Sequence, residues 1–140
     1  MRLGVGLATV VVAVVLTLAL GPGPSEATGV VDGPVVAVSR TGAAYPMALV
    51  QGPLNLRGDC LMLGGAVVFW PAGTSWDTES QSVVFSGDFD GAARVDSHFV
   101  GGGGVYAPDD DFLRGLGAAG AVLRDCVAAT GARNLTLAYP

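Results

Sequence analysis

The run Ala66–Trp70 limits what this chain can fold into more than any other stretch. In an extended strand, Val67 and Phe69 point to one face. Val68 and Trp70 point to the opposite face. Because both faces are apolar, we expect this strand to be covered on both sides. A strand in the middle of a small barrel meets that requirement.

Short strands separated by glycine-rich turns account for most of the chain around this run. Leu54 and Leu56 alternate with polar residues, which indicates a half-buried strand. The stretch 57–59 then predicts a hairpin turn, because its central glycine readily adopts positive φ. Cys60–Leu63 is expected to start the return strand, which Gly64 and Gly65 bend and the run Ala66–Trp70 continues. The other expected strands are Ser82–Phe85, Ala92–Val100, which the glycines at 101–104 interrupt or end, and residues 134–139.

One helix is expected late in the chain. Three aspartates at 109–111 lie where acidic residues complement a helix N-terminus. Apolar residues then recur at helical spacing, and glycines weaken the first half of the pattern. The pattern therefore predicts a helix over Ala118–Thr130 with Gly131 as its C-cap.

These elements predict a mainly β fold, a small antiparallel barrel or roll of short strands with one late α-helix. The barrel-like domain is expected to occupy residues 46–140. Residues 28–45 are rich in glycine, proline and small residues, and we expect a flexible lead-in that contributes one strand near Val35–Val38.

The first 27 residues have the layout of a secretory signal peptide. Arg2 precedes an uncharged apolar run, Leu3–Leu20, which a Gly-Pro-Gly-Pro stretch ends. Small residues at 25 and 27 predict a cut after Ala27. An uncleaved anchor is the alternative, since the run is close to the length that spans a bilayer. We therefore expect a secreted or cell-envelope protein, with membrane contact only through this segment if it is uncleaved.

Cys60 and Cys126 are the two cysteines of the chain. In an oxidising compartment, such a pair is expected to form a disulfide. Closing a loop of this length would stabilise the fold by about 4 kcal/mol in the chain-entropy model. Two unpaired buried thiols are the alternative. A metal site is a weaker interpretation, because the chain has a single histidine.

The composition excludes several classes of function. The net charge is −5 and all seven basic residues are arginine. Without lysine there is no P-loop lysine and no Schiff-base lysine. An acidic chain with scattered arginines is also expected to bind nucleic acid poorly. Such binding depends largely on clustered cationic side chains that contact the phosphates.

The two tryptophans raise the question of a ligand surface. Trp70, directly before Pro71, is expected at a strand end where its indole N–H can reach a turn carbonyl. Trp76 has acidic neighbours and could be exposed, although core and turn packing is the main interpretation for both rings. If a ligand surface exists, the candidates are Trp76, Asp77, Tyr106 and the glycine run 101–104.

Two stretches resemble metal and cofactor motifs without meeting their requirements. Residues 86–91 resemble the start of a calcium loop, but Ser97 stands where a bidentate glutamate is required. Residues 101–106 fail the dinucleotide fingerprint, because Tyr106 fills the third glycine position. The sequence therefore predicts neither a bound metal nor a cofactor.

Asp96, Ser97 and His98 invite comparison with a catalytic triad. On one extended strand, Asp96 and His98 share a face while Ser97 lies on the other, so the three cannot converge. We therefore interpret His98 as structural and expect no catalytic residues. A dyad of Asp96 and His98 serving a distant serine is the remaining catalytic arrangement.

The stretches LNLRGDCLML, VVFWPAGTSWD and GGGGVY, followed by one cysteine before a terminal strand, resemble a family of uncharacterised secreted or lipoprotein-like domains from actinobacteria. The resemblance covers residues 48–139. It implies a small β-barrel and export, and it carries over no catalytic residue. The chain departs from that family in lacking a lipobox and in reading VDSHFV before the glycines, which leaves the strand register there open.

Together these features predict an exported, non-catalytic domain that binds a protein partner or an envelope ligand at the cell envelope or outside the cell. A small secreted hydrolase using Asp96 and His98 is one alternative. A secreted protease inhibitor that presents a disulfide-braced loop is another, supported only by size and export.

Overall fold

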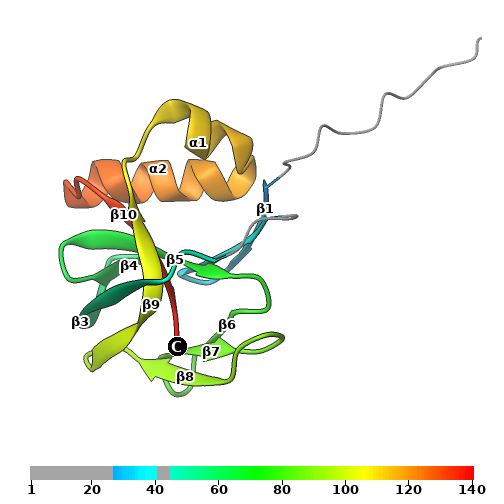
Figure 1. Ribbon diagram of the computed structural model, residues 1–140. Helices are drawn as coiled ribbons and strands as arrows, with labels where there is room; N and C mark the ends of the chain where they lie inside the picture. Colours follow the sequence, from blue (N-terminus) through cyan, green and yellow to red (C-terminus); the bar gives the residue numbers. More distant parts are fainter. Residues whose placement is uncertain (1–26, 41–44) are drawn as a thin grey trace, which may run out of the picture.

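The computed structural model describes residues 27–40 and 45–140 (Figure 1). The expected signal segment, apart from Ala27, lies outside these residues. The strands are β1 (Ala27–Asp32), β2 (Val35–Arg40), β3 (Ala48–Arg57), β4 (Cys60–Leu63), β5 (Ala66–Pro71), β6 (Ser75–Asp77), β7 (Ser82–Phe85), β8 (Gly91–Arg94), β9 (His98–Tyr106) and β10 (Leu135–Tyr139), and the helices are α1 (Asp110–Gly115) and α2 (Ala118–Thr130).

A closed β-barrel forms the centre of the fold, as the sequence predicts. The strands follow the order β5-β10-β9-β3-β4, and a second pairing of β4 with β5 closes the ring. The neighbouring pairs are antiparallel except β10 and β5, which are parallel. A parallel pair requires a crossover connection. Here the chain makes its last crossing through α2 before it enters β10 (Figure 1).

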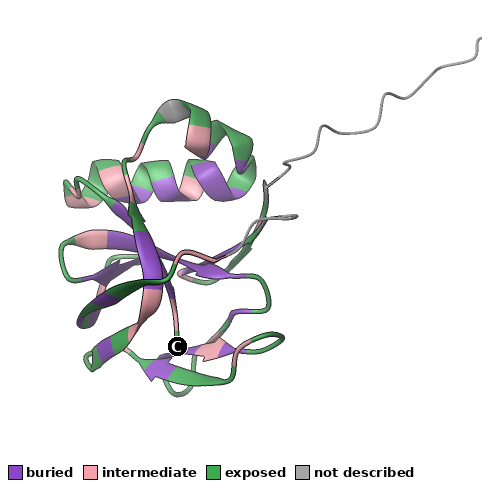
Figure 2. Ribbon diagram, viewed as in Figure 1, coloured by how far each residue is buried: buried purple, intermediate pink, exposed green. Residues whose placement is uncertain are grey.

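Strand β5 is covered on both faces, as its sequence requires. Val67 and Phe69 belong to an outer core between the barrel wall and the helices. Val68 and Trp70 belong to an inner core inside the barrel. Figure 2 shows β5 as a nearly continuous buried band between the two layers. One strand therefore contributes to both cores.

The outer core lies under the two helices. α2 spans the predicted residues Ala118–Thr130 and ends at Gly131, whose φ of 71° gives the expected left-handed cap. Its inward face presents Leu123 and Cys126 to the wall formed by β2, β4, β5 and β10. The aspartates expected at a helix N-terminus begin a separate, shorter helix, α1, and Asp109 caps it by accepting a hydrogen bond from the N–H of Phe112 at 2.8 Å. Within the described chain, no helix is both long enough and apolar enough to cross a bilayer.

A small sheet of order β6-β7-β8 packs against the inner core. It contributes Phe85, whose ring lies edge-on to Trp70 at a centroid distance of 5.4 Å. Phe99 lies edge-on to the same indole at 5.7 Å. The expected hydrogen bond from the Trp70 indole to a turn carbonyl is absent, because apolar side chains surround this fully buried ring.

The glycine run 101–104 is part of β9, which corrects the expectation that it interrupts or ends a strand. Its residues pair with β10 on one side and with β3 on the other. A side chain at Gly101 would overlap the carbonyl of Tyr139, and one at Gly103 would overlap the carbonyl of Leu137. Gly101 and Gly103 are therefore required by the close approach of β10.

The strand expected over Ala92–Val100 is divided in two. β8 ends at Arg94, residues 95–97 turn, and β9 begins at His98. The turn is stabilised by hydrogen bonds to other strands, which a local sequence pattern does not reveal. The short strand β6 is also absent from the expected strands. The bend expected at Gly64 and Gly65 is instead a tight turn, and the stretches on either side of it, β4 and β5, are separate antiparallel strands.

The expected flexible lead-in is instead a hairpin of β1 and β2. All six residues of β1 pair with β2, and β2 joins the end of β5. The predicted strand at Val35–Val38 is present and all four residues are buried, which explains why the hairpin is held in place. Residues 41–44 lie outside the described part of the lead-in.

The predicted cysteine pair is brought together. The sulfur atoms of Cys60 and Cys126 lie 2.07 Å apart, at disulfide-bonding distance. The bond joins the first residue of β4 to α2, across a sequence separation of 66 residues. It therefore ties the helical layer to the barrel wall.

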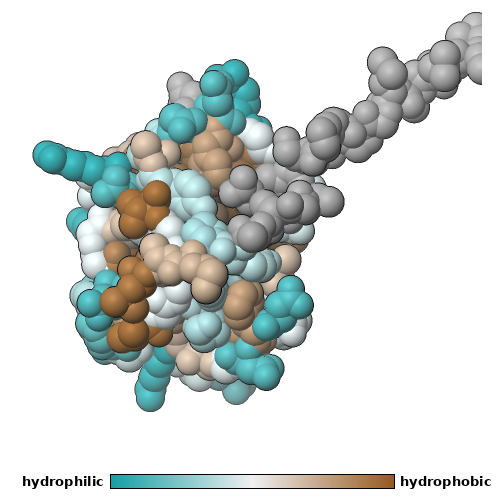
Figure 3. Space-filling model, viewed as in Figure 1, coloured by the Kyte–Doolittle hydropathy of each residue, from teal (hydrophilic) through white to brown (hydrophobic). Residues whose placement is uncertain are grey.

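Apolar side chains are also exposed on the wall that the helices leave uncovered. Figure 3 shows them gathering over β3 and β9. The large exposed apolar residues of this part of the molecule are Met47, Leu49, Val100 and Val105. We call this surface the β3–β9 face.

Replacing Gly101 with alanine should destabilise the fold by about 1–3 kcal/mol, because the new methyl group would overlap the β10 backbone. Gly65→Ala is the matched control, since nothing lies within 4 Å of a side chain placed there. Urea denaturation should find the control within about 0.5 kcal/mol of the wild type. Equal losses in the two variants would contradict the close packing of β9 against β10.

Candidate functional site

The aromatic ligand candidates belong to different cores. Trp76 is half-buried on β6, and its indole lies against Gly33 in the turn between β1 and β2. Its backbone N–H donates to Oδ2 of Asp32 at 2.9 Å. Tyr106 instead stacks on Phe112 in the outer core, with ring planes 4° apart and centroids 5.5 Å apart. The structure therefore does not bring Trp76 and Tyr106 together in one aromatic surface.

Asp77 organises the turn that follows β6. Its carboxylate accepts the backbone N–H of Glu79 at 3.2 Å and the hydroxyl of Ser80 at 2.6 Å. The backbone carbonyl of Thr78 accepts a hydrogen bond from the side-chain amide of Gln81 at 2.8 Å. The turn is therefore fixed by its own side chains. Asp77 does not line the polar cavity described next, but its hydrogen-bond partner Ser80 does.

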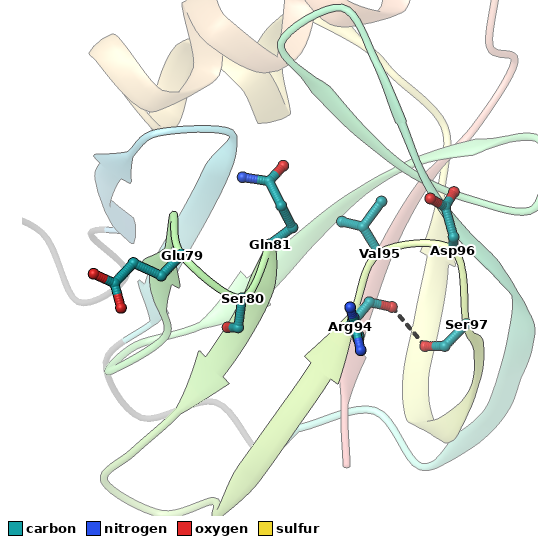
Figure 4. A pocket seen from close by; sticks show the side chains of 7 residues that line it. All are labelled: Glu79, Ser80, Gln81, Arg94, Val95, Asp96 and Ser97. Carbon is teal, nitrogen blue, oxygen red and sulfur yellow. Dashed lines mark hydrogen bonds between the residues drawn. The ribbon is translucent and has the colours of Figure 1, made fainter.

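That cavity is a depression of about 470 Å³ between two turns (Figure 4). Its volume is within the range of small-molecule sites. One wall comes from the turn between β6 and β7, and the other from the turn between β8 and β9. We call this cavity the polar depression, and its lining residues are Glu79, Ser80, Gln81, Arg94, Val95, Asp96 and Ser97.

Hydrogen bonds tie the two turns to each other and to the barrel. The N–H of Val95 donates to the carbonyl of Gln81 at 2.9 Å. Leu54 of β3 is fully buried. Its carbonyl accepts a hydrogen bond from the N–H of Asp96 at 2.7 Å, and its own N–H donates to the carbonyl of Ser97 at 2.9 Å. The Ser97 hydroxyl donates to the carbonyl of Arg94 at 2.5 Å (Figure 4). The polar depression is therefore anchored to the inner core.

Two lining residues have an unusual backbone conformation. Gln81 has a φ of 51° and Asp96 has a φ of 67°. Within residues 27–40 and 45–140, these are the two non-glycine residues with positive φ. Such conformations are uncommon for residues with side chains, and they gather at ligand sites more often than elsewhere. Both occur in the wall of one cavity.

The lining can both donate and accept hydrogen bonds. Glu79 and Asp96 supply carboxylates, Arg94 supplies a guanidinium, and Gln81 supplies an amide. These groups suit a ligand with several hydroxyl or amide groups. Across the described part of the chain, no three His, Cys, Asp or Glu side chains gather closely enough to hold a metal ion.

The arrangement expected for Asp96 and His98 is not formed. Asp96 lies in the turn, whereas His98 is the exposed first residue of β9, so the two do not share a face of one strand. His98 does not line the polar depression. The stretch 86–90, compared above with a calcium loop, is a loop between β7 and β8.

Three aromatic residues that the sequence did not single out form a cluster beside the glycine strand. Tyr45, Phe89 and Tyr139 have ring centroids between 4.9 and 5.6 Å apart. The Tyr139 ring lies over Gly102, and its hydroxyl donates to the carbonyl of Pro46. An aromatic ring over a strand glycine covers backbone that has no side chain of its own. The cluster therefore stabilises the end of β10.

A second cavity, of about 560 Å³, lies between α2 and the tips of two hairpins. Its wall is mainly apolar and includes the two cysteines of the disulfide, Cys60 and Cys126. The positive-φ residues in this wall are Gly33 and Gly58, which adopt such angles without strain. The polar depression is therefore the stronger candidate for a ligand site.

Local sequence did not identify most of the polar depression. The sequence pattern marks Asp96 only through its comparison with a catalytic triad, and it carries no signal for Gln81 or Arg94. Their conformations depend on bonds between two turns and a distant strand. The one available signal was the polar run Asp77–Gln81 between two short strands, which could have marked a turn rich in hydrogen-bonding groups.

No protein-family model, no curated protein and no solved structure matches the chain. The resemblance to actinobacterial secreted domains therefore stays a prediction.

Trp76→Ala should lower the free energy of unfolding by about 2 kcal/mol, because the half-buried indole packs against the β1–β2 turn. Trp76→Phe should lose less, since it keeps part of that contact. Urea denaturation of both variants measures the difference. An alanine variant as stable as the wild type would show that the indole is not a packing residue.

Proposed function

We propose that the protein is an exported, non-catalytic binding module, and that the polar depression binds a small hydroxyl-rich ligand of the saccharide class. The cell envelope, or the space outside it, is the proposed place of action. The observation that carries the proposal is the occurrence of both strained non-glycine residues, Gln81 and Asp96, in the wall of one polar cavity.

The anchoring of the turns supports binding, because a preformed site loses less conformational freedom when its ligand arrives. The bonds from Val95 to Gln81 and from Asp96 to Leu54 hold the lining before any ligand is present. A saccharide would use the mixed lining fully. Its hydroxyls can donate to the carboxylates of Glu79 and Asp96 while its oxygens accept from Arg94.

Export is supported by the cysteine pair and by the N-terminal sequence. A disulfide that closes a long loop persists in an oxidising compartment, and Cys60 and Cys126 lie at bonding distance. The layout of residues 1–27 is that of a secretory signal peptide.

A binding role, in preference to a catalytic one, is supported by the hydrogen bonds of the two lining serines. A nucleophilic serine needs a base that accepts its proton. Ser97 donates to the carbonyl of Arg94, which is not a base. Ser80 donates to Oδ2 of Asp77, whose Oδ1 accepts the N–H of Glu79, so this pair holds the turn together.

Asp96→Asn should weaken saccharide binding at least about tenfold, equivalent to about 1.4 kcal/mol. Asparagine tolerates positive φ, so the turn is kept while the charge is removed. The protein purified in its oxidised form would first be screened with mono- and disaccharides by thermal shift. The affinity for the best ligand would then be measured by isothermal titration calorimetry.

Asp125→Asn is the matched control, because Asp125 is an exposed aspartate of α2 that does not line the polar depression. It should leave the affinity unchanged. Equal effects in the two variants, or no saccharide bound at all, would contradict the proposal. If a bound saccharide were instead cleaved, and His98→Ala abolished the cleavage, the protein would be a hydrolase.

A further inference from the structure

We propose that β1 is a docking edge for a second copy of this chain, and that two β1 strands pair antiparallel to join the two sheets. The two copies would be related by a twofold axis that passes beside Val30. This inference concerns a surface separate from the polar depression and does not depend on what that cavity binds.

The topology leaves β1 with one free edge. β1 is the terminal strand of the seven-stranded sheet, beyond the closed barrel (Figure 1). It pairs with β2 along its full length, from Ala27 opposite Arg40 to Asp32 opposite Val35. On its other side, no strand among the described residues pairs with it. Its outward N–H and C=O groups are therefore a template for another strand.

Among residues 27–40 and 45–140, the two edge strands of the small sheet are protected, and β1 is not. Proteins commonly protect an edge by keeping it short or placing charged residues on it. β6 has three residues and carries Asp77, and β8 has four residues and carries Arg94. β1 has six residues, and its first charged residue is the last, Asp32. Val30 is 66% exposed and Val31 is 42% exposed.

The β1 edge is also rigid. Gly29 lies so close to Ala119 of α2 that a side chain on the glycine would overlap the alanine methyl group. At the end of the strand, Asp32 accepts the backbone N–H of Trp76 at 2.9 Å. The strand is therefore fixed from one face by α2 and at its tip by β6. A partner strand would not have to order it first.

The strand is complementary to itself in one antiparallel register. If Val30 lies opposite Val30 of the second copy, Thr28 lies opposite Asp32 and Gly29 lies opposite Val31. The Val30 side chains of the two copies then cover each other, and the Asp32 carboxylate of each copy lies opposite the Thr28 hydroxyl of the other. No like charges face each other in this register, although the chain carries a net charge of −5. Directly opposed apolar pairs and opposed polar pairs both stabilise antiparallel strands.

Sedimentation equilibrium of the oxidised protein in its exported form tests the proposal directly. The wild type should show a reversible monomer–dimer equilibrium over the micromolar to millimolar range. Val30→Lys should be monomeric throughout, because a lysine on an edge strand opposes pairing. Since the valine side chain is mostly exposed, the variant should keep the wild-type fold, which circular dichroism would check.

Val100→Lys is the matched control. Val100 is 56% exposed, but it pairs with Gln51 of β3 inside the barrel wall, and it belongs to the β3–β9 face. This variant should dimerise like the wild type. Loss of the dimer in Val100→Lys but not in Val30→Lys would place the interface on the β3–β9 face and overturn the proposal. A wild-type protein that stays monomeric at millimolar concentration would also overturn it.

A second measurement needs no variant. Amide hydrogen exchange in β1 should slow as the wild-type concentration rises, because the outward amides become hydrogen-bonded in the dimer. Exchange in β9 should stay the same. Concentration-independent exchange in β1 would overturn the proposal.

Discussion

The burial of β5 on both faces is the constraint on which the rest of the structure depends. Its residues alternate between two apolar cores, with Phe69 facing the helices and Trp70 facing the barrel interior. The apolar side chains on both faces of one strand are buried only if a layer covers each face. The helices and β2 supply cover on one side, and the closed barrel with its small sheet supplies it on the other. The disulfide then links α2 to the barrel wall.

The same arrangement positions the polar depression. The inner core includes Leu54 of β3 and Val83 of β7, so the strands next to both turns are anchored inside the barrel. Leu54 also bonds the β8–β9 turn through its backbone. The unusual angles of Gln81 and Asp96 persist because these surroundings hold them. The polar side chains of the depression are thus held in position by a scaffold that is otherwise apolar.

Local patterns in the sequence were sufficient for some elements and insufficient for others. Short-range periodicity and capping predict the two apolar faces of β5, the extent of α2 and its glycine cap. The pairing of the cysteines follows from the expected oxidising compartment and from there being two of them. The glycine strand could not be predicted, because glycines 101–103 are required by contact with β10, some 35 residues later. Gln81 and Asp96 were missed for a similar reason, since their conformations depend on bonds to each other's turn and to β3.

Residue-resolved native-state hydrogen exchange of the ligand-free protein tests the central claim that the inner core preforms the polar depression. The N–H groups of Val95 and Asp96 donate to Gln81 and Leu54, so both should exchange as slowly as the amides of the adjoining strands. The amides of the exposed loop 86–90 provide the fast reference within the same spectrum. Exchange of Val95 and Asp96 at the rate of that loop would show that the depression is not formed before its ligand binds.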